Sequence, residues 1–386
     1  MTKVLFLHHG GNPIRGSEMY ILNLLAGLDR RRFEPLVVCD EEVFAREVQR
    51  RAGITPFRQK LPQIMMDGNE RRFEIATWVV AVYRIARIIR KHRIALLYCN
   101  NGRPMQAAYY AARLTGVPII CHVHCPYEKR YVYLYRLYRA DKMIFPSKAV
   151  EAHITGRKKF RKPFETVYYG LDLVRFAPAE QRDSRLRLSL GIPADAVVIG
   201  QVGSLIERKG VDVLLRAFAR LYGEEKNAYL VLVGSGVDEP RFRSLAQSLG
   251  VMDRLRFAGE HSVADDFYKH LIDINVLCSR NDALPYSLLE GAACGLPCVG
   301  SNVDGIPEEI IDGHSGHLFP REDPEALANR LLLLLRSAEL RKSFGINGRK
   351  MMESRFSMEN NLQRIQEIME DLAVKPGAGA GSGSQG

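Results

Sequence analysis

The sequence lacks any apolar run as long as the eighteen residues that mark a membrane-spanning helix. Its apolar start, Met1–Leu7, is interrupted at His8 and is too short for the apolar core of a secretory signal. We therefore expect neither a membrane-spanning protein nor a secreted one. The sequence predicts a cytoplasmic chain.

Cysteine is also scarce, with seven residues spread through the apolar segments of a chain of 386. An odd and scattered set is typical of reduced core residues and not of a disulfide framework. The close pairs Cys121/Cys125 and Cys294/Cys298 lack the further ligands that a tetrahedral zinc site needs. We therefore expect no bound metal.

Acidic residues are few in the first half of the chain. Residues 1–180 hold 31 Lys and Arg against 16 Asp and Glu, whereas residues 181–386 hold 24 against 28. The positive net charge of +11 therefore comes from the first half, which is expected to face something anionic.

The basic residues of this half gather in three segments, Trp78–Arg93, Lys129–Arg139 and Gly156–Lys162. The second segment interleaves tyrosines with arginines, as segments at a membrane surface do. Two interpretations stay open: a core helix with a solvated basic face, and peripheral contact with an anionic membrane at its inner face. Nucleic acid is not an expected partner, because no recognition motif accompanies the charge.

What the sequence does contain is a regular alternation of short apolar runs with helical patterns. Buried parallel strands have continuous apolar sequences, and the helices between them cover the faces of a sheet. The candidate strands are Val4–His8, Pro35–Cys39, Ala95–Cys99, Pro118–Val123 and Lys142–Pro146, followed by Val197–Val202, Tyr229–Val233, Leu255–Phe257, Ile274–Leu277 and Pro297–Ser301.

Length and alternation together predict an α/β protein of two doubly wound domains. We expect them at residues 1–175 and 176–354, joined by a linker near Asp172–Arg187, where Pro178 and charged residues interrupt both patterns. The glycine-rich and serine-rich residues 375–386 are expected to be a disordered tail outside the fold.

Polar motifs follow several of the predicted strands, and in doubly wound sheets ligands bind beyond the carboxyl ends of the strands. The loop His8–Glu18 contains glycines and opens a helix, so its backbone could approach a phosphate. It lacks the three glycines at fixed offsets that mark a dinucleotide site. Taken alone, this loop is also compatible with an ordinary turn.

A second loop follows the predicted strand that ends at Val202. There Arg208 and Lys209 precede Gly210 and a new helical pattern. Cations in this place would meet a bound pyrophosphate. The alternative is that both are ordinary surface residues.

A third motif is a spaced pair of acids. Pro285 is expected to begin a helix that ends at Gly295, which leaves Asp282 before the helix and Glu290 within it. A helix N-terminus between two carboxylates suits a diphosphate that carries hydroxyl-bearing groups on both sides. Nucleotide-sugars, with a ribose on one side and a hexose on the other, have this shape.

The chain contains six motifs in a fixed order: Gly16–Glu18, His122–His124, Val167–Asp172, Val202–Gly210, Val233–Gly236 and Asp282–Glu290. Their order and spacing make the chain similar to the retaining glycosyltransferases of family four, from Val4 to about Ala373. The resemblance implies the GT-B fold, in which two Rossmann-like domains face each other across a cleft. It further implies that the C-terminal domain holds the nucleotide-sugar donor, that the N-terminal domain holds the acceptor, and that no metal or other cofactor takes part. A helix at residues 355–373 is expected to cross back onto the first domain.

The resemblance also assigns roles to single residues. Glu290 matches the acid that binds the ribose hydroxyls, and Asp282 matches the acid that contacts the transferred sugar. Lys209 matches the lysine that neutralises the leaving diphosphate. The remaining donor-binding residues that it implies are Gly16, Gly203, Ser204 and Arg208, with the backbone amides of Leu284, Tyr286, Ser287 and Leu288.

His124 matches a histidine that lies near the reacting sugar, with His122 as the alternative. With Lys209 and Asp282 it completes the expected catalytic set, although a histidine in an apolar strand is often only a packed core residue. No side chain is an obvious nucleophile. The resemblance implies retention of the anomeric configuration by a front-face route, in which the leaving phosphate helps to take the acceptor proton.

Four positions depart from the family pattern. Asp282 and Ser204 stand where glutamate and arginine are usual, Arg15 where glycine is usual, and Tyr169 where asparagine is common. The shorter reach of Asp282 bears on which sugar is transferred, and Arg208 is a candidate replacement for the missing arginine. The second acid and the lysine are retained, which favours an active enzyme.

Three functions follow from these observations. The first is transfer of a sugar from a nucleotide-diphosphate sugar, with UDP favoured, to a glycan or lipid-linked acceptor in the assembly of a surface polysaccharide or glycolipid. The second is a non-catalytic nucleotide-sugar binder that acts as a partner subunit, which the departures at Ser204 and Asp282 motivate. The third is a nicotinamide dehydrogenase, which shares the architecture but would need the missing glycine pattern.

Overall fold

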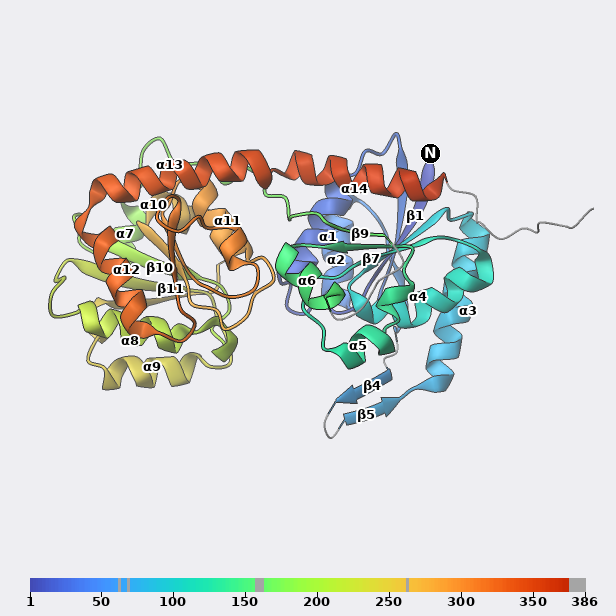
Figure 1. Ribbon diagram of the computed structural model, residues 1–386, viewed down its shortest axis with the longest axis horizontal. Coiled ribbons are helices and arrows are strands. Elements are labelled where there is room, and N and C mark those ends of the chain that lie inside the picture. Colours follow the sequence, from blue (N-terminus) through green and yellow to red (C-terminus); the bar gives the residue numbers. More distant parts are fainter. Residues whose placement is uncertain (62–63, 68–69, 157–162, 262–263, 375–386) are drawn as a thin grey trace, which may run out of the picture. The chain divides into compact units, whose positions relative to one another are not determined.

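The structure, a computed structural model, describes residues 1–61, 64–67, 70–156, 163–261 and 264–374, with the backbone alone for 64–67 and 70–73. The chain forms two compact units, shown in Figure 1. Unit 1 comprises Met1–Tyr168 and the chain from Glu359 onward, and unit 2 comprises Tyr169–Met358. The sequence predicts this boundary slightly later, between residues 175 and 176. The predicted tail, residues 375–386, lies outside the described residues.

Unit 1 is built on a parallel sheet with the strand order β3-β2-β1-β6-β7-β8-β9 in the part of the chain that the structure describes. The consecutive residues Val4–Leu7 of the inner strand β1 are all fully buried. Because neighbouring residues of a strand point to opposite faces, both faces of the sheet are covered. The strands are β1 Thr2–His8, β2 Phe33–Cys39, β3 Phe57–Arg58, β6 Leu96–Asn100, β7 Ile119–His122, β8 Lys142–Phe145 and β9 Phe164–Thr166, with β4 Ile64–Asp67 and β5 Glu70–Phe73 as a separate antiparallel pair.

The helices of unit 1 follow from apolar residues at helical spacing. In α3, for example, Val82, Ile85, Ala86 and Ile89 are buried, and the helix ends at His92, just before Arg93, which has a φ of 55°. The helices are α1 Gly16–Gly27, α2 Glu42–Ala52, α3 Ile75–His92, α4 Gly102–Thr115, α5 Lys129–Leu134, α6 Lys148–Thr155 and α14 Met358–Ala373, with a 3-10 turn at Leu137–Arg139.

Unit 2 has a second parallel sheet, with the order β12-β11-β10-β13-β14-β15 among its described residues. Its strands are β10 Val197–Val202, β11 Ala228–Val233, β12 Leu255–Gly259, β13 Ile274–Leu277, β14 Cys298–Ser301 and β15 Gly316–Phe319. Its helices are α7 Arg185–Ser189, α8 Val211–Leu221, α9 Glu239–Ser248, α10 Asp265–His270, α11 Tyr286–Ala293, α12 Pro324–Arg336 and α13 Ala338–Arg355, with 3-10 turns at Glu207–Lys209, Met252–Arg254 and Ile306–Glu308.

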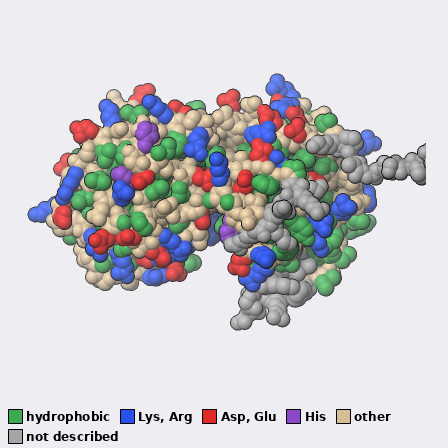
Figure 2. Space-filling model, in the orientation of Figure 1, with side chains coloured by type: hydrophobic (Ala, Val, Ile, Leu, Met, Phe, Trp, Pro, Cys, Tyr) green, Lys and Arg blue, Asp and Glu red, His purple; other side chains and the backbone are tan. Residues whose placement is uncertain are grey.

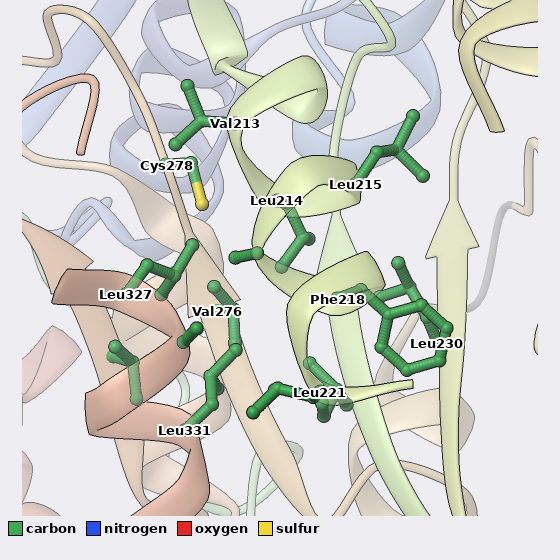
Figure 3. Close-up of a cluster of buried hydrophobic side chains, with 14 of the residues drawn as sticks. Val213, Leu214, Leu215, Phe218, Leu221, Leu230, Val276, Cys278, Leu327 and Leu331 are labelled. Atoms are coloured by element: carbon green, nitrogen blue, oxygen red, sulfur yellow. The ribbon is translucent and has the colours of Figure 1, made fainter. Parts of the chain in front are cut away.

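The core of unit 2 lies between α8, α12 and the sheet (Figure 3). Leu214 and Phe218 of α8 are fully buried, as are Leu327 and Leu331 of α12. Val276 of β13 completes this contact from the sheet. Burial of such side chains contributes about 1.5–3 kcal/mol each, so this packing holds the start of α8 and the end of β13 in fixed positions.

Both sheets share one topological feature that positions a site. In unit 1, β2 and β3 are added on one side of β1, and the chain then returns to place β6 on the other side of β1. In unit 2, β11 and β12 are added on one side of β10, and β13 then lies on its other side. The crevice beyond the carboxyl ends of such a pair is the usual ligand site of doubly wound sheets. We call these the reversal points of the two units.

The C-terminal helix α14 packs on unit 1. The Asn361 side chain donates to the carbonyl of Tyr168 at 2.6 Å, and Arg364 donates to the carboxylate of Glu165 at 2.6 Å. A Cβ on Gly27 of α1 would lie 2.4 Å from a methyl group of Leu362. Two separate stretches of chain therefore complete unit 1.

Candidate active site

The loop after β10 is pressed against the loop after β13 at the reversal point of unit 2. Gly210 has a φ of 63°, and a Cβ there would lie 2.0 Å from the carbonyl oxygen of Cys278. Gly203, the first residue after β10, has a φ of 140°, a conformation that other residues rarely adopt. The glycines thus allow Arg208 and Lys209 to lie beside the β13 loop.

Arg280 fastens these two loops together. Its backbone N–H donates to the carbonyl of Arg208 at 2.8 Å, and its guanidinium donates to both carboxylate oxygens of Asp212 in α8, at 2.9 and 3.1 Å. The pairing raises the pKa of Arg280. Burial alone would raise the pKa of Asp212, but the pairing outweighs it and holds that pKa below its ordinary value. The sequence analysis does not identify either residue. Their positions in the sequence could have indicated them, because Arg280 stands just before Asp282 and Asp212 just after Gly210.

Asp282 accepts three hydrogen bonds in the loop after β13. Its Oδ2 lies 2.6 Å from Lys209 Nζ, 3.3 Å from the Arg208 guanidinium and 3.2 Å from the Ser279 hydroxyl. Burial alone would raise the pKa of Asp282, but the charges of Lys209 and Arg208 outweigh it and hold the pKa below its usual value. The structure therefore brings two predicted site residues, Lys209 and Arg208, against the ionised carboxylate of a third, Asp282. Ser204 lies on the same loop as the two cations.

Helix α11 begins directly after Pro285, which has a φ of −77°, and stops before Gly295, which has a φ of 76°. It lies close to β13, because a Cβ on Gly291 would be 2.2 Å from the Asn275 amide nitrogen. That amide donates to the carbonyl of Ser287 at 2.8 Å. The N-terminus of the helix is thereby fixed next to the loop that carries the first acid.

The first turn of α11 holds most of the predicted backbone donors. The Tyr286 ring stacks on Tyr169 with centroids 5.1 Å apart and an angle of 5° between the rings, which fixes the orientation of this turn. Leu284 packs its side chain into the core. The amide of Leu288 donates to the carbonyl of Pro285 at 3.1 Å. Its role as a donor to a bound ligand stays a prediction.

The second acid of the pair, Glu290, is half-buried within α11. Burial raises the pKa of Glu290 to about 7, although the Tyr268 hydroxyl and the charge of Arg175 favour the ionised form. Arg175 is itself paired with Asp265 at 2.8 Å. Near neutral pH, Glu290 therefore changes between a carboxylate, which only accepts hydrogen bonds, and an acid that can donate one.

A further acid, Glu309, is buried beside this cluster. Its side chain is 2% exposed, and neither carboxylate oxygen has a hydrogen-bond partner among the described residues. Burial, reinforced by the negative charge of Asp282, raises the pKa of Glu309 well above its usual range. The sequence analysis does not identify this residue, because two adjacent glutamates, Glu308 and Glu309, are typical of an exposed surface segment.

Replacing Glu309 by methionine should stabilise the protein, because an unpaired buried polar group costs about 1–3 kcal/mol. Glutamate in an unfolded chain loses its proton near pH 4.5, whereas folded Glu309 keeps it to a higher pH. Stability is therefore lost as the pH rises above that value, and the gain from Glu309→Met should grow between about pH 5 and pH 8. Thermal unfolding midpoints at both pH values measure the gain, with Glu308→Met as the control. A variant that melts lower than the wild type at pH 8 would contradict this expectation.

In unit 1, the loop after β1 leads into α1, whose first residue is Gly16. The amide of Arg15 donates to the Glu18 carboxylate at 3.1 Å, which closes the first turn. Glu18 is mostly buried and lies 3.5 Å from the His8 ring. Gly16 is exposed at the start of the helix, so its backbone is accessible to a ligand.

The two histidines that the sequence singles out lie at the end of β7. Nδ1 of His122 is 2.7 Å from the Tyr98 hydroxyl in the interior, and its ring stacks on His124 with centroids 4.2 Å apart. Nε2 of His124 is 2.7 Å from Oδ1 of Asn100. Burial lowers the pKa of His124 to about 3, although the charge of Glu18 acts in the opposite direction. His124 is therefore a neutral imidazole, and its role at the reacting sugar stays a prediction.

The three basic segments lie in different settings. Trp78–Arg93 forms most of α3. In Lys129–Arg139, Tyr131 and Tyr135 are buried and arginines lie over tyrosine rings, so this segment exposes less aromatic surface than its composition indicates. Of the third segment, residues 157–162 lie outside the described residues.

Nothing that the structure describes as a helix is long and apolar enough to cross a membrane. Within the same described ranges, no group of three or more His, Cys, Asp and Glu side chains is arranged to hold a metal ion. All seven cysteines are free thiols, six of them buried, as the sequence predicts.

Two family models match the chain, one for each unit. The model of Glycosyltransferase Family 4 matches residues 14–175, and that of Glycosyl transferases group 1 matches residues 183–351. Together they cover most of the chain and contain every motif of the candidate site. The chain therefore belongs to the glycosyltransferases of family four, and the resemblance found in its motifs is confirmed.

Curated relatives fall in the same family. N-acetyl-alpha-D-glucosaminyl L-malate synthase of Bacillus anthracis is 28% identical over 55% of this chain and 55% of the relative, and D-inositol 3-phosphate glycosyltransferase of Saccharomonospora viridis is 34% identical over 53% and 49%. The lipopolysaccharide core biosynthesis glycosyltransferase LpsE of Rhizobium meliloti is 33% identical over 49% and 54%. The chain thus spans about half the length of the curated relatives that it matches.

The fold itself is shared over nearly the whole chain. HepE of Anabaena, solved in complex with UDP, superposes with a TM-score of 0.84 at 19% identity, covering 96% of this chain and 100% of that chain. It has also been solved with UDP-glucose. At this identity the likeness shows the fold, two Rossmann-like domains of the GT-B type, as the sequence predicts.

Proposed function

We propose that this protein transfers a sugar from a nucleotide-diphosphate sugar to a glycan or lipid-linked acceptor. The observation that carries the proposal is the cluster at the reversal point of unit 2, where Lys209 and Arg208 meet Asp282 just before α11. Two cations beside a helix N-terminus attract a diphosphate. The carboxylates of Asp282 and Glu290 can accept hydrogen bonds from the hydroxyls of the sugar and the ribose. Membership of the glycosyltransferase family favours a nucleotide-sugar over other diphosphates.

The proposed nucleotide is UDP. Support comes from the relatives, since HepE has been solved with UDP and with UDP-glucose. In this chain, Glu290 would bind the ribose, Lys209 and Arg208 the diphosphate, and Asp282 the sugar. Gly16, Gly203 and Ser204 would lie along the phosphates, where small residues allow the backbone to approach.

We further propose that transfer retains the anomeric configuration without a metal or other cofactor. Asp282 is a poor candidate for a nucleophile, because it is tied to two cations that hold its pKa low. Lys209 and Arg208 supply the positive charge that stabilises a leaving diphosphate. The leaving phosphate would then take the acceptor proton on the same face of the sugar.

Two measurements on the purified protein test this function. A thermal-shift panel of UDP, GDP, ADP and NAD should give a selective shift with UDP, since a ligand at ~100 times its Kd stabilises the native state by about 2.7 kcal/mol. UDP-sugars should then release UDP in the presence of a suitable acceptor, with a rate that EDTA leaves unchanged. A shift with NAD alone would overturn the proposal, and UDP binding by a protein that turns over no donor would favour the non-catalytic partner subunit.

We also propose that the acceptor is reached at an anionic membrane, through the outer face of α3. This face is apolar over its first turns and basic over its last, a combination that suits the headgroup region of a lipid surface. Figure 2 shows apolar and basic side chains gathered over the part of unit 1 that α3 covers. The outer face comprises Ile75, Val79, Val80 and Tyr83, which are 46–64% exposed, followed by the exposed Arg84, Arg87, Arg90 and Lys91.

Changing Val79 and Tyr83 together to aspartate should weaken binding to anionic liposomes at least about tenfold, because apolar burial is lost and two like charges are added. Co-sedimentation at low and high salt measures the effect, and high salt should weaken the wild type as well. A matched control changes two exposed leucines of unit 2, Leu188 and Leu333, to aspartate and should leave binding unchanged. Equal binding by both double variants would rule out α3 as the contact.

A further inference from the structure

Positive charge is concentrated in residues 75–140 of unit 1, which run from α3 to the 3-10 turn at Leu137–Arg139. This stretch holds 11 Lys and Arg against a single acid, Glu128. Among the described residues, its only ion pair joins Glu128 to Arg130. A surface of this kind attracts an anionic partner, because binding that partner relieves the repulsion among the cations.

Arg136 differs from the other cations of this stretch because aromatic rings fix its position. Its guanidinium carbon lies 5.1 Å from the ring centre of Tyr110 and 5.7 Å from that of Tyr109. Both rings belong to α4, and their centroids are 5.2 Å apart. We call these two rings the tyrosine platform. A guanidinium over aromatic rings is attracted by their electrons, so the platform restricts a side chain that is otherwise flexible.

The tyrosine platform is itself anchored to α3. The ring of Tyr110 meets Trp78 of α3 edge to face, with centroids 4.8 Å apart and an angle of 85° between the rings. The indole Nε1 of Trp78 donates to the carbonyl of Gln106 in α4 at 2.9 Å. Val79, the next residue of α3, is 52% exposed and belongs to its outer face. The platform and Arg136 therefore adjoin that face, where α3 packs along α4 (Figure 1).

The Arg136 side chain is available to an anion. It is half-buried, and within the described part of the chain no hydrogen bond or ion pair engages its guanidinium. Its nitrogens are not among the buried polar atoms, so they are accessible from solvent. A planar guanidinium can direct two parallel N–H groups at one oxyanion. Because the platform already restricts this side chain, binding costs it less conformational freedom than it costs an arginine in open solvent.

Phosphate suits this setting better than a carboxylate. A phosphate monoester carries about −1.5 to −2 charges near pH 7 and three acceptor oxygens, whereas a carboxylate carries one charge and two oxygens. The other cations of residues 75–140 favour the group with the greater charge. The exposed apolar residues on the outer face of α3 add a preference for a phosphate at a lipid surface over one in solution.

We propose that Arg136, held on the tyrosine platform, binds the phosphate headgroup of an anionic lipid and thereby fixes where unit 1 contacts the membrane. The proposal rests on the membrane contact proposed for α3, and it adds the residue and the lipid group that take part in recognition. The remaining cations of the stretch would attract the surface without distinguishing one anion from another.

Vesicle binding tests this recognition on the full chain. Phosphatidylcholine vesicles receive either phosphatidic acid or oleate, in amounts that give equal surface potentials. The wild type should bind the phosphatidic acid vesicles about fivefold more tightly. Arg136→Lys keeps the charge but removes the planar fork, so the preference should fall below about twofold. The matched control is Arg113→Lys, the same change at an exposed arginine in the last turn of α4, and it should keep the full preference.

Two further measurements complete the test. The melting temperature and the affinity for UDP should be unchanged in both arginine variants, because the proposed UDP site lies in unit 2. Should Arg136→Lys fail to fold, Tyr109→Leu is the second variant; it removes one ring of the platform, leaves the arginine, and should at least halve the preference. Glycerol 3-phosphate is the soluble probe, and at millimolar concentration it should give no thermal shift that depends on Arg136.

The outcomes separate this site from the proposed function. Equal binding of the wild type to both kinds of vesicle overturns the proposal, as does a full preference in Arg136→Lys. A thermal shift with glycerol 3-phosphate that Arg136→Lys abolishes would assign the site to a soluble phosphate and overturn the lipid. A wild type that binds no anionic vesicle overturns the membrane contact together with this site, while its response to UDP still tests sugar transfer. A phosphate preference in a protein that binds no UDP supports the site and overturns the proposed function alone.

Discussion

Replacing Lys209 by methionine should lower kcat about 10²- to 10³-fold while weakening nucleotide binding much less. Removing one preorganised donor to a developing negative charge has an effect of this size. The Lys209 ammonium lies 2.6 Å from Asp282 and is mostly buried, so its position is fixed before the donor bond breaks. A charge that acts mainly on the departing diphosphate affects kcat and not ground-state affinity.

Two further variants make this result specific. Lys226→Met changes an exposed lysine just before β11, at the opposite end of the strands from the site, and should keep full activity. Arg208→Met should have a smaller effect than Lys209→Met, because its side chain is 41% exposed and more screened by water. Initial rates with a UDP-sugar and titration calorimetry with UDP give kcat and Kd. Equal losses in the two constants for Lys209→Met would contradict the role in the transition state.

Replacing Glu290 by alanine should raise the Kd of a UDP-sugar about 10- to 150-fold, with a small change in kcat at saturating donor. Hydrogen bonds to a charged group contribute about 1.5–3 kcal/mol, and a ribose contact is made in the ground and transition states alike. Calorimetric titration measures the Kd. A variant that binds the donor as tightly as the wild type would remove Glu290 from the donor site.

The same carboxyl predicts a pH dependence of donor affinity. The pKa of Glu290 is raised to about 7, so the acid is protonated below that pH and has lost part of its capacity to accept hydrogen bonds. Donor affinity of the wild type should therefore fall between about pH 8 and pH 6. Glu290→Gln is neutral at both values and should show no such fall. A UDP-sugar is the suitable ligand, because its diphosphate does not titrate in this range.

The central strands of this fold could be predicted closely from the sequence. β10 and β13 have the predicted bounds, Val197–Val202 and Ile274–Leu277, because a strand buried on both faces is a continuous apolar run. The edge strands β9 and β15 are absent from the prediction. They are short, and polar residues such as Glu165 and His317 interrupt the apolar pattern.

The residues of the candidate site could also be named from the sequence, but their contacts could not. Pro285 and Gly295 mark the ends of a short helix in the sequence itself, and the structure begins and ends α11 beside them. The pairing of Arg280 with Asp212 joins residues 68 positions apart, so no local sequence pattern predicts it. The contact of Asn100 with His8 joins residues 92 positions apart and depends on the strand order, which brings the ends of β1 and β6 together.

The order of the chain has a consequence for biosynthesis. Unit 2 is a single uninterrupted segment, so a nascent chain can complete it as the segment leaves the ribosome. Unit 1 needs α14 to cover the surface around Gly27, and α14 is translated only after the whole of unit 2. The first half of the protein to be made is therefore the last to be finished, and until then its apolar surface on α1 is exposed to chaperones and to other nascent chains.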